Sequence, residues 1–357
     1  MKKLEVRKED LIYNLNSLRN YLGDDTKVIA VVKANAMGLG LIECSKLLVE
    51  NKVDMLAVST PDEAFTLREN EIECKILLLT PIYDEEVVKK LVNRNIIITI
   101  DSPESLEIAK TCEGVKAHLK VDTGFGRYGM LYNKKDAILK LYKEWENVEF
   151  TGIFSHLSNP KDEKWSTTQF IRFRDVLDYL KANGVNYGIS HLSSSNATIR
   201  YKNMRLDAVR VGSLLSGRTM VDGLDIRKVG KFKTIVNEVK TVPRGFNISY
   251  GNRYKTKRET KIAIIPVGYM DGFNLTKDVD DFTLKNKFAF LGKAIKDLFR
   301  KQELRVTIKD KTYKVIGRLG MYHTIVDVTG SDVKSQDVVT LNVKPMYVNE
   351  NIRREYV

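Results

Sequence analysis

Several side chains capable of acid–base or nucleophilic chemistry come at the end of short apolar runs, or directly after them. They are Lys33, Lys120 with Asp122 just beyond it, His156, His191 and Arg210. Each run has the length and composition of a buried β-strand. In parallel barrel enzymes the carboxyl ends of the strands meet at one face, and the chemistry lies there. Any one of these residues alone fits an ordinary loop or core position, but together they predict a single site.

Lys33 closes an apolar run in the segment AVVKANAMGLG, residues 30–40. A lysine at the end of a buried strand is partly desolvated, and desolvation lowers the pKa of its amine because the charged form loses hydration. A neutral amine is a nucleophile that forms an imine with an aldehyde. The segment therefore indicates a lysine suited to carry a carbonyl compound covalently, although this peptide alone fits an ordinary loop lysine equally well.

Eight apolar, β-branched runs lie between residues 28 and 212, with longer amphipathic segments between most of them. The runs are 28–33, 54–58, 75–79, 96–100, 117–121, 150–155, 187–192 and 207–212. Several are apolar almost throughout, which is typical of parallel strands buried on both faces. Eight strands with seven intervening helices predict an α/β fold, an N-terminal (β/α)8 TIM-type barrel over residues 8–235. A doubly wound sheet is the alternative, because it needs no fixed number of strands.

Three of the intervening segments carry the signals of helix ends. Segment 102–112 begins with Ser102 as an N-cap, 61–70 begins with proline followed by acidic residues, and 164–184 ends at a glycine. Each of these residues is favoured at that helix end by its hydrogen bonding or backbone geometry. We therefore predict helices over these three segments.

The sequence changes character after about residue 235. Runs such as ELRVTIKDKTYKVIG and DVVTLNV alternate or carry turn signals at short spacing, which is typical of antiparallel strands. We predict a mainly antiparallel β domain over residues 236–357, joined by a strand from residues 1–7. One helix is expected near 287–300.

The composition excludes several classes of function. The net charge is +13, but the 59 lysine and arginine residues are interleaved with acids and no nucleic-acid-binding motif accompanies them. We therefore expect a basic solvated surface and no nucleic-acid partner. No run approaches the roughly 18 apolar residues of a membrane span, and no secretory signal is evident, so we expect a cytoplasmic protein without a membrane partner. Three cysteines and four histidines without ligand spacing predict no disulfide framework and no metal.

Nine segments, in order along the chain, resemble the motifs of the alanine racemase family. They are VVKANAMGLG (31–40), HLKVDTGFGRYGM (118–130), FSHLSNPKDE (154–163), SHLSSSNAT (190–198), AVRVGSLLSG (208–217), ISYGNRY (248–254), PVGYMDGF (266–273), GRLGM (317–321) and RREY (353–356). Each segment is short, but nine segments in family order across nearly the whole chain are specific.

The resemblance implies a fold type III enzyme that interconverts L- and D-alanine with pyridoxal 5'-phosphate, supplying D-alanine for peptidoglycan. By similarity, Lys33 carries the cofactor and is one of two catalytic bases, and Tyr250 is the other. In the family this tyrosine comes from the partner subunit, which implies a homodimer with shared active sites. A tyrosine of ordinary pKa, about 10, is a poor base near neutrality and needs cationic neighbours. Arg127 is the family's candidate for that role and for binding the substrate carboxylate.

The resemblance also assigns residues that bind the cofactor. Arg210 faces the pyridine nitrogen, where a permanently charged guanidinium disfavours protonation of that nitrogen. His156 binds the cofactor beside it, and His191 supports both, although satisfied core histidines fit these two positions as well. The phosphate group is assigned to Ser195, Gly212, Ser213 and Tyr356.

Other matched positions concern the substrate. Met321 and Tyr269 correspond to a carboxylate contact and to a residue at the entrance, and Lys120 to a position that is carbamylated in several relatives. Met37 stands where relatives have a tyrosine that binds the phosphate, and Tyr322 alters the entrance. The reaction type survives these departures, but the substrate stays open between alanine, serine and a broader range of amino acids.

Three other functions fit part of the pattern. A fold type III decarboxylase would share the barrel and the lysine peptide, but it would carry a catalytic cysteine in the β domain, whereas all three cysteines precede residue 113. A single-barrel cofactor carrier would end near residue 235. A nucleic-acid-binding role depends only on the net charge. We therefore favour the racemase.

Overall fold

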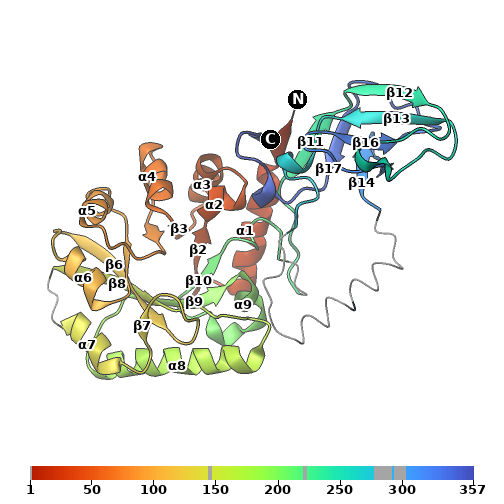
Figure 1. Cartoon of the computed structure of the whole chain (residues 1–357). Helices are drawn as coiled ribbons and strands as arrows, with labels where there is room; N and C mark the ends of the chain where they lie inside the picture. The colour runs from red at the N-terminus through yellow and green to blue at the C-terminus, as the bar shows by residue number, and fades with distance from the viewer. Residues whose placement is uncertain (1, 144–146, 220–222, 277–291, 293–302) are drawn as a thin grey trace. The chain divides into compact units, whose positions relative to one another are not determined.

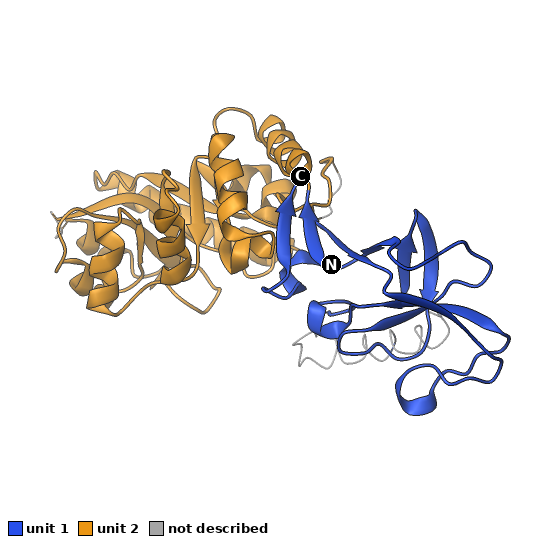
Figure 2. Ribbon diagram, turned by 90° about the horizontal axis from the view of Figure 1, so that it is seen from above, with its two compact units in different colours: residues 1–6, 230–357 blue, residues 7–229 orange. Residues whose placement is uncertain are grey.

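The computed structural model describes residues 2–143, 147–219, 223–276, 292 and 303–357 (Figure 1). The chain divides into two units, Arg7–Val229 and Met1–Val6 with Gly230–Val357 (Figure 2). The division after Val229 differs from the predicted boundary after residue 235, because strand β11 (Lys231–Ile235) pairs with strands of the second unit. Likewise, the first unit begins at Arg7 rather than at residue 8.

In its described part, the larger unit contains eight parallel strands in the order β4-β3-β2-β10-β9-β8-β6-β5. The strands are β2 (Lys27–Val31), β3 (Met55–Val58), β4 (Ile76–Leu78), β5 (Ile98–Ile100), β6 (Val115–Asp122), β8 (Val148–Phe154), β9 (Ile189–Ser194) and β10 (Ala208–Val211). A parallel bridge between Leu77 and Ile97 joins β4 to the residues before β5 and completes the circle. The predicted barrel is confirmed, and all eight strands lie within two residues of the predicted runs.

The barrel forms because its strands are apolar on both faces. Every residue of β3, β4, β5 and β10 is buried. One face of each strand packs inside the barrel, where Ile29, Met55, Leu77 and Ala208 form a shared cluster. The other face packs under the helices, so the near-continuous apolar runs have no solvated side.

Helices connect the strands (Figure 1). They are α1 (Lys8–Leu22), α2 (Lys33–Met37), α3 (Leu41–Glu50), α4 (Pro61–Glu69), α5 (Glu85–Asn93), α6 (Pro103–Ala109), α7 (Lys135–Lys143), α8 (Glu163–Ala182) and α9 (Ser195–Arg200), with the short strand β7 (Met130–Leu131) beside β6. The three predicted helices are confirmed as α4, α6 and α8. The Ser102 side chain caps α6 by accepting a hydrogen bond from the Ser105 amide, and the Thr60 side chain caps α4 by accepting one from the Glu63 amide.

The second unit is a sheet in the order β12-β13-β16-β15-β14-β17-β11-β1-β18. Besides β11 its strands are β1 (Lys3–Val6), β12 (Glu238–Val242), β13 (Thr260–Ile265), β14 (Arg305–Ile308), β15 (Lys311–Val315), β16 (Thr324–Asp327), β17 (Val338–Leu341) and β18 (Arg353–Tyr356). All pairs are antiparallel except β1 with β18, so the predicted mainly antiparallel β domain is confirmed. The N-terminal strand β1 pairs with β11 and β18 in this sheet. The helix predicted near 287–300 lies outside the described residues, apart from Gly292.

Candidate active site

A cavity of about 280 Å³ lies at the carboxyl ends of the barrel strands. Seven of the strands, or the loops that follow them, contribute to its wall. The predicted site residues found there are Lys33, Lys120, Arg127, His156, Ser195, Arg210, Gly212 and Ser213. The structure therefore brings together cations, hydroxyl groups and a histidine that are far apart in the sequence.

Lys33 lies two residues beyond β2 and begins the short segment α2. The four residues after it, Ala34–Met37, all have positive φ angles between 52° and 56°, so α2 is a left-handed turn. Left-handed helical geometry costs roughly 1–2 kcal/mol for each L-residue with a Cβ atom. Local contacts offset part of this cost: the Asn35 side chain accepts a hydrogen bond from the Leu41 amide at 2.7 Å, and the Gly38 amide donates to the Ala34 carbonyl at 2.9 Å.

The environment of Lys33 favours its neutral form. Burial lowers the pKa of the Lys33 amine, and the positive charges of Arg127 and Arg210 lower it further. Glu63 acts in the opposite direction and raises this pKa. The predicted desolvated amine is therefore present, although Lys33 follows the strand rather than ending it.

Arg210 is buried inside the barrel and makes hydrogen bonds in several directions. Its Nη1 atom donates to Nδ1 and to the backbone oxygen of His191, at 2.6 and 3.0 Å. Its Nη2 atom donates to the Ser155 carbonyl at 2.6 Å and to Nδ1 of His156 at 3.0 Å. Burial lowers the pKa of Arg210 to about 9, so the guanidinium stays charged at neutral pH in a fixed position.

His191 lies in the middle of β9 and not at a strand end as predicted, and it does not line the cavity. Its ring stacks on Phe154, with the planes 3° apart, and its Nε2 atom lies 2.8 Å from Nδ1 of His118. Because arginine only donates, His191 accepts at Nδ1, carries its proton on Nε2 and donates to His118. His118 was not among the predicted residues, because it sits within an apolar run whose two faces are both buried.

The surroundings of these three histidines, His118 and His191 buried and His156 half-buried, favour their neutral forms. Burial lowers the pKa of His118 to about 3 and that of His156 to about 3, and the positive charge of Arg210 contributes to both shifts. Burial also holds the pKa of His191 well below its ordinary value. Arg210 is thus surrounded by hydrogen-bond acceptors that do not compete with it for positive charge.

Arg127 projects from the loop after β6, and Asp122 shapes that loop. The Asp122 carboxylate accepts hydrogen bonds from the amides of Gly124, Phe125 and Gly126, at 2.8 to 3.0 Å. Gly129 closes the loop with a φ of 123°, and a Cβ atom there would lie 2.7 Å from the Asp122 nitrogen. The Arg127 guanidinium lies over the Phe125 ring, 4.5 Å from its centroid, on the solvent side of the cavity.

Lys120 points into the same cavity from within β6. Its ammonium lies 5.2 Å from the centroid of Tyr128 and 5.4 Å from that of Phe154. Burial, with the positive charges of Arg127 and Arg210, lowers the pKa of Lys120 to about 8. Lys120 is therefore, beside Lys33, the second lysine of the cavity whose pKa is lowered.

Hydroxyl groups and backbone amides gather at the wall formed by β9 and β10. The Ser195 hydroxyl accepts hydrogen bonds from the amides of Gly212 and Leu214, at 3.2 and 3.3 Å. Ser213 pairs with the hydroxyl of Thr219. The hydroxyl groups of Ser195 and Ser213 and the nearby backbone amides are neutral donor groups of the kind that bind phosphate. Met37 packs closely here: its Cε atom would lie 2.8 Å from a Cβ atom at Gly212.

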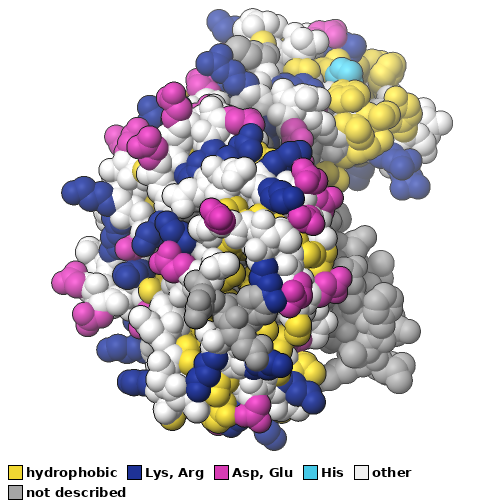
Figure 3. All heavy atoms as spheres, turned by 90° about the vertical axis from the view of Figure 1, so that its left-hand side faces the viewer, with side chains coloured by type: hydrophobic (Ala, Val, Ile, Leu, Met, Phe, Trp, Pro, Cys, Tyr) yellow, Lys and Arg dark blue, Asp and Glu magenta, His cyan; other side chains and the backbone are white. Residues whose placement is uncertain are grey.

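The remaining predicted residues belong to the second unit. Tyr356 lies in β18, while Tyr250 and Tyr269 begin the single-turn 3-10 helices η2 (Tyr250–Asn252) and η3 (Tyr269–Asp271) within the connecting loops, and Met321 lies in a loop. Tyr250, Tyr269 and Met321 are 71%, 39% and 50% exposed. The last two loops are joined, because the Tyr269 amide donates to the Gly320 carbonyl at 3.2 Å. Figure 3 shows hydrophobic side chains gathered in a patch around a histidine on this part of the surface. The exposed large apolar residues of these loops also include Phe246, Met270 and Tyr322.

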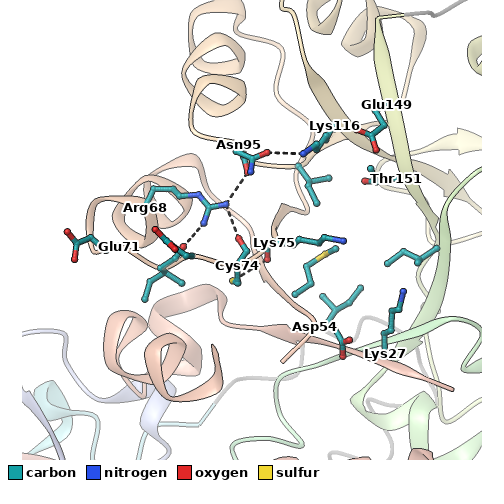
Figure 4. Close-up of a pocket in the computed structure, with 16 residues that line it drawn as sticks. Lys27, Asp54, Arg68, Glu71, Cys74, Lys75, Asn95, Lys116, Glu149 and Thr151 are labelled. Atoms are coloured by element: carbon teal, nitrogen blue, oxygen red, sulfur yellow. Dashed lines mark hydrogen bonds between the residues drawn. The ribbon is translucent and has the colours of Figure 1, made fainter. Parts of the chain in front are cut away.

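A second, larger cavity of about 830 Å³ lies at the amino ends of the barrel strands (Figure 4). Its wall mixes lysines such as Lys27, Lys75 and Lys116 with several carboxylates around an apolar floor. Arg68 is fixed there by backbone carbonyls, including those of Ile72 and Cys74. This end of a (β/α)8 barrel serves stability rather than chemistry, so size alone does not identify the site.

The described residues contain no group of three or more histidine, cysteine, aspartate or glutamate side chains placed to hold a metal ion. No helix in the described ranges is long and apolar enough to cross a membrane.

A parallel (β/α)8 barrel with an amine and two guanidinium groups at its mouth, followed by an antiparallel β domain, defines a class of two-domain barrel enzymes. Comparison with known proteins narrows this class. Residues 6–219 match the model "Alanine racemase, N-terminal domain", and residues 229–353 match "Alanine racemase, C-terminal domain". The chain belongs to the alanine racemase family.

Individual relatives agree along nearly the full chain. The alanine racemase of Methanococcus maripaludis is 34% identical over 345 residues, covering 92% of this chain and 85% of that protein. Alanine racemase 2 of Caldanaerobacter subterraneus is 35% identical over 338 residues, with coverages of 92% and 81%. The structure of alanine racemase from Clostridium difficile 630 superposes with a TM-score of 0.84 at 28% identity, covering 100% of this chain and 95% of that one.

Proposed function

We propose that the chain interconverts L- and D-alanine with pyridoxal 5'-phosphate, using Lys33 and Tyr250 as its two catalytic bases. The main support for this proposal is the Lys33 amine, which faces the cavity. Burial and the positive charge of Arg127 lower its pKa, and donors of the kind that bind phosphate lie at the wall formed by β9 and β10. Membership of the alanine racemase family supports the reaction and the cofactor. The product D-alanine would serve peptidoglycan synthesis.

The residues of the cavity fit the cofactor. Lys33 would hold its aldehyde, and Arg210 would face its pyridine nitrogen, supported by His156 and His191. Ser195, Gly212 and Ser213 would bind its phosphate, together with Tyr356 of the second unit. When bound, the cofactor draws electron density from the α-carbon of the amino acid and so makes the α-proton acidic. The cavity volume of about 280 Å³ suits a small ligand of this kind.

The chain's own residues would move the proton. Neutral Lys33 accepts the α-proton at Nζ on one face of the substrate, and Tyr250 donates a proton from its hydroxyl on the other face. In the reverse direction the two roles exchange. Arg127 would bind the substrate carboxylate and stabilise the deprotonated tyrosine, since a nearby cation lowers the pKa of a phenol. Met321 would contact the same carboxylate, and Tyr269 would guard the entrance.

We further infer a homodimer in which Tyr250 acts in the partner's site. The 71% exposed side chain of Tyr250, among other exposed aromatic and methionine residues of the same unit, supports this arrangement, because large exposed apolar patches mark protein interfaces. Serine or a broader range of amino acids remains the alternative substrate class, because Met37 and Tyr322 depart from the family pattern.

The direct test is incubation of the purified protein with L-alanine, L-serine and other L-amino acids, followed by chiral chromatography. We expect D-alanine to form fastest. The purified protein should be yellow because of its bound cofactor, and borohydride reduction should attach that chromophore to Lys33. Lys33→Ala should lose about 10²- to 10⁴-fold in rate, as expected for a lost acid–base catalyst. Lys27→Ala, at the opposite end of β2, is the matched control and should keep its activity. Attachment to another lysine would contradict the proposal.

A further inference from the structure

The carboxylate of Glu63 joins the loop that follows β2 to the loop that follows β3. Its Oε1 atom accepts a hydrogen bond from the Ala34 amide at 2.6 Å. Its Oε2 atom accepts from the amides of Ser59 and Thr60, at 3.1 and 3.3 Å. Three backbone donors from two strand ends thus converge on one side chain, which α4 presents in its first turn.

The first of these contacts is made at the residue next to Lys33. Ala34 begins the left-handed turn, and its φ of 53° is unfavourable for a residue with a Cβ atom. Asn35 and Gly38 hold the far end of the turn through backbone and side-chain hydrogen bonds. At the near end, the Ala36 amide donates to the Val32 carbonyl at 2.7 Å, and Glu63 adds a side-chain contact at Ala34. Glu63 therefore helps to fix the backbone from which the Lys33 side chain departs.

Glu63 also differs in charge from the other groups that act on Lys33. The positive charges of Arg127 and Arg210 and the burial of the amine all disfavour the ammonium form, and Glu63 alone among the contributing charges favours it. Charge-assisted hydrogen bonds to a carboxylate are also stronger than bonds between neutral groups. The Glu63 side chain therefore both holds the backbone next to Lys33 and offsets part of the arginine charge that acts on the Lys33 amine.

We propose that Glu63 is a positioning residue for Lys33, which anchors the left-handed turn after the lysine and balances the arginine charges at its amine. This inference rests on the proposed role of Lys33 in the reaction. The simpler role of Glu63 is the capping box of α4, in which the Glu63 amide also donates to the Thr60 hydroxyl at 3.3 Å. Thr60→Ala removes that cap and leaves the contact between Glu63 and Ala34 in place, so the two roles can be separated.

Hydrogen exchange of the purified protein tests the anchor. In Glu63→Ala, exchange in the peptide that covers residues 33–41 should become at least about tenfold faster, because a hydrogen bond to a charged acceptor is lost. Thr60→Ala should leave that peptide protected, and so should Asp62→Asn, which changes an exposed acidic residue in the same turn of α4. Unchanged protection in Glu63→Ala, or equal loss in Thr60→Ala, would overturn the anchor.

Reductive methylation with formaldehyde and cyanoborohydride tests the charge effect on protein freed of cofactor. Peptide mass spectrometry gives the labelling rate of Lys33 as a function of pH. Because the Glu63 charge raises the pKa of Lys33, Glu63→Gln should move the midpoint of this profile to lower pH, and Asp62→Asn should move it much less. Equal shifts in both variants would refute the role. The readout needs neither cofactor nor substrate, so it can fail while racemisation succeeds, and the reverse.

Discussion

At the scale of single residues, the site is governed by which groups keep their charge. Two lysines and three histidines of the barrel interior have a lowered pKa, first because burial removes hydration from their charged forms and then because of Arg210 or Arg127. Arg210, whose pKa burial lowers to about 9, remains charged at neutral pH. The interior thus combines a fixed cation with nitrogen atoms whose neutral forms are favoured, which suits an amine that acts as a nucleophile and base.

This charge pattern predicts acid sensitivity. The pKa of His118 and of His156 falls from 6.5 to about 3 on folding. Between these values the unfolded chain binds more protons than the folded protein, so the free energy of unfolding decreases as the pH falls from 6.5 toward 3. Each histidine contributes a slope of up to about 1.4 kcal/mol per pH unit. Urea unfolding at pH 7, 6 and 5 measures the total slope.

The variant His118→Gln should reduce that slope by up to about 1.4 kcal/mol per pH unit, the contribution of one proton, although it also lowers the free energy of unfolding at pH 7. His323→Gln removes an exposed histidine of the second unit and is the control. A slope that is identical in the wild-type protein and His118→Gln would show that His118 titrates normally in the folded state.

The residues that sequence reasoning found are those that end or follow apolar runs. Lys33, Lys120, His156 and Arg210 meet in one cavity because parallel strands place their carboxyl ends together. His118 and Glu63 were missed for different physical reasons. The inward face of a strand buried on both sides cannot be distinguished from its outward face by hydrophobicity, and a carboxylate in a helix's first turn has the composition of an ordinary cap.

At the scale of elements, the strands were predictable and the turn after β2 was not. Runs such as KILLL and IIITI have no solvated face and match β4 and β5. The Ala-Asn-Ala-Met segment contains no glycine, yet four residues adopt positive φ angles. The local hydrogen bond of Asn35 and the tertiary contact from Glu63 overrule the backbone preference there, and a single sequence does not reveal the tertiary contact.

The pairing of β6 with β8 requires a residue without a side chain opposite His118. A register shift between Ala117 and His118 places Gly152 opposite the imidazole, where a Cβ atom would lie 2.6 Å from ring atoms. Gly152→Ala should therefore displace His118 and destabilise the protein by about 1–3 kcal/mol, as overpacked cores do. Denaturant unfolding measures this loss.

The double variant Gly152→Ala/His118→Ala is the matched control for that steric reason. Removal of the ring creates the space that the new methyl group needs, so the two effects should be non-additive and the double variant should be more stable than the sum of the single losses predicts. Additive losses would mean that Gly152 is required for its backbone rather than for the ring opposite it.

At the scale of the whole molecule, the proposed reaction needs residues from both units. Lys33 belongs to the barrel, whereas Tyr250, Met321 and Tyr356 belong to the β domain. The division into two folds was predictable because hydrophobic periodicity changes near residue 235. Periodicity and composition do not predict that a second subunit completes each site, because they describe a single chain. Only the family resemblance implies a shared site.

Mixing two inactive variants decides whether the sites are shared. Lys33→Ala and Tyr250→Phe should each have little activity. If Tyr250 acts in the partner's site, a hybrid dimer contains one site in which both residues are altered and one in which both are intact. Random pairing makes about half of the dimers hybrids, so dissociating, mixing and refolding the variants should restore about a quarter of the wild-type rate, measured by chiral chromatography. If both residues instead served one site within a chain, every site in every hybrid would lack one base and mixing would restore nothing. Lys33→Ala mixed with the double variant Lys33→Ala/Tyr250→Phe supplies the control, because no pairing of those chains contains Lys33.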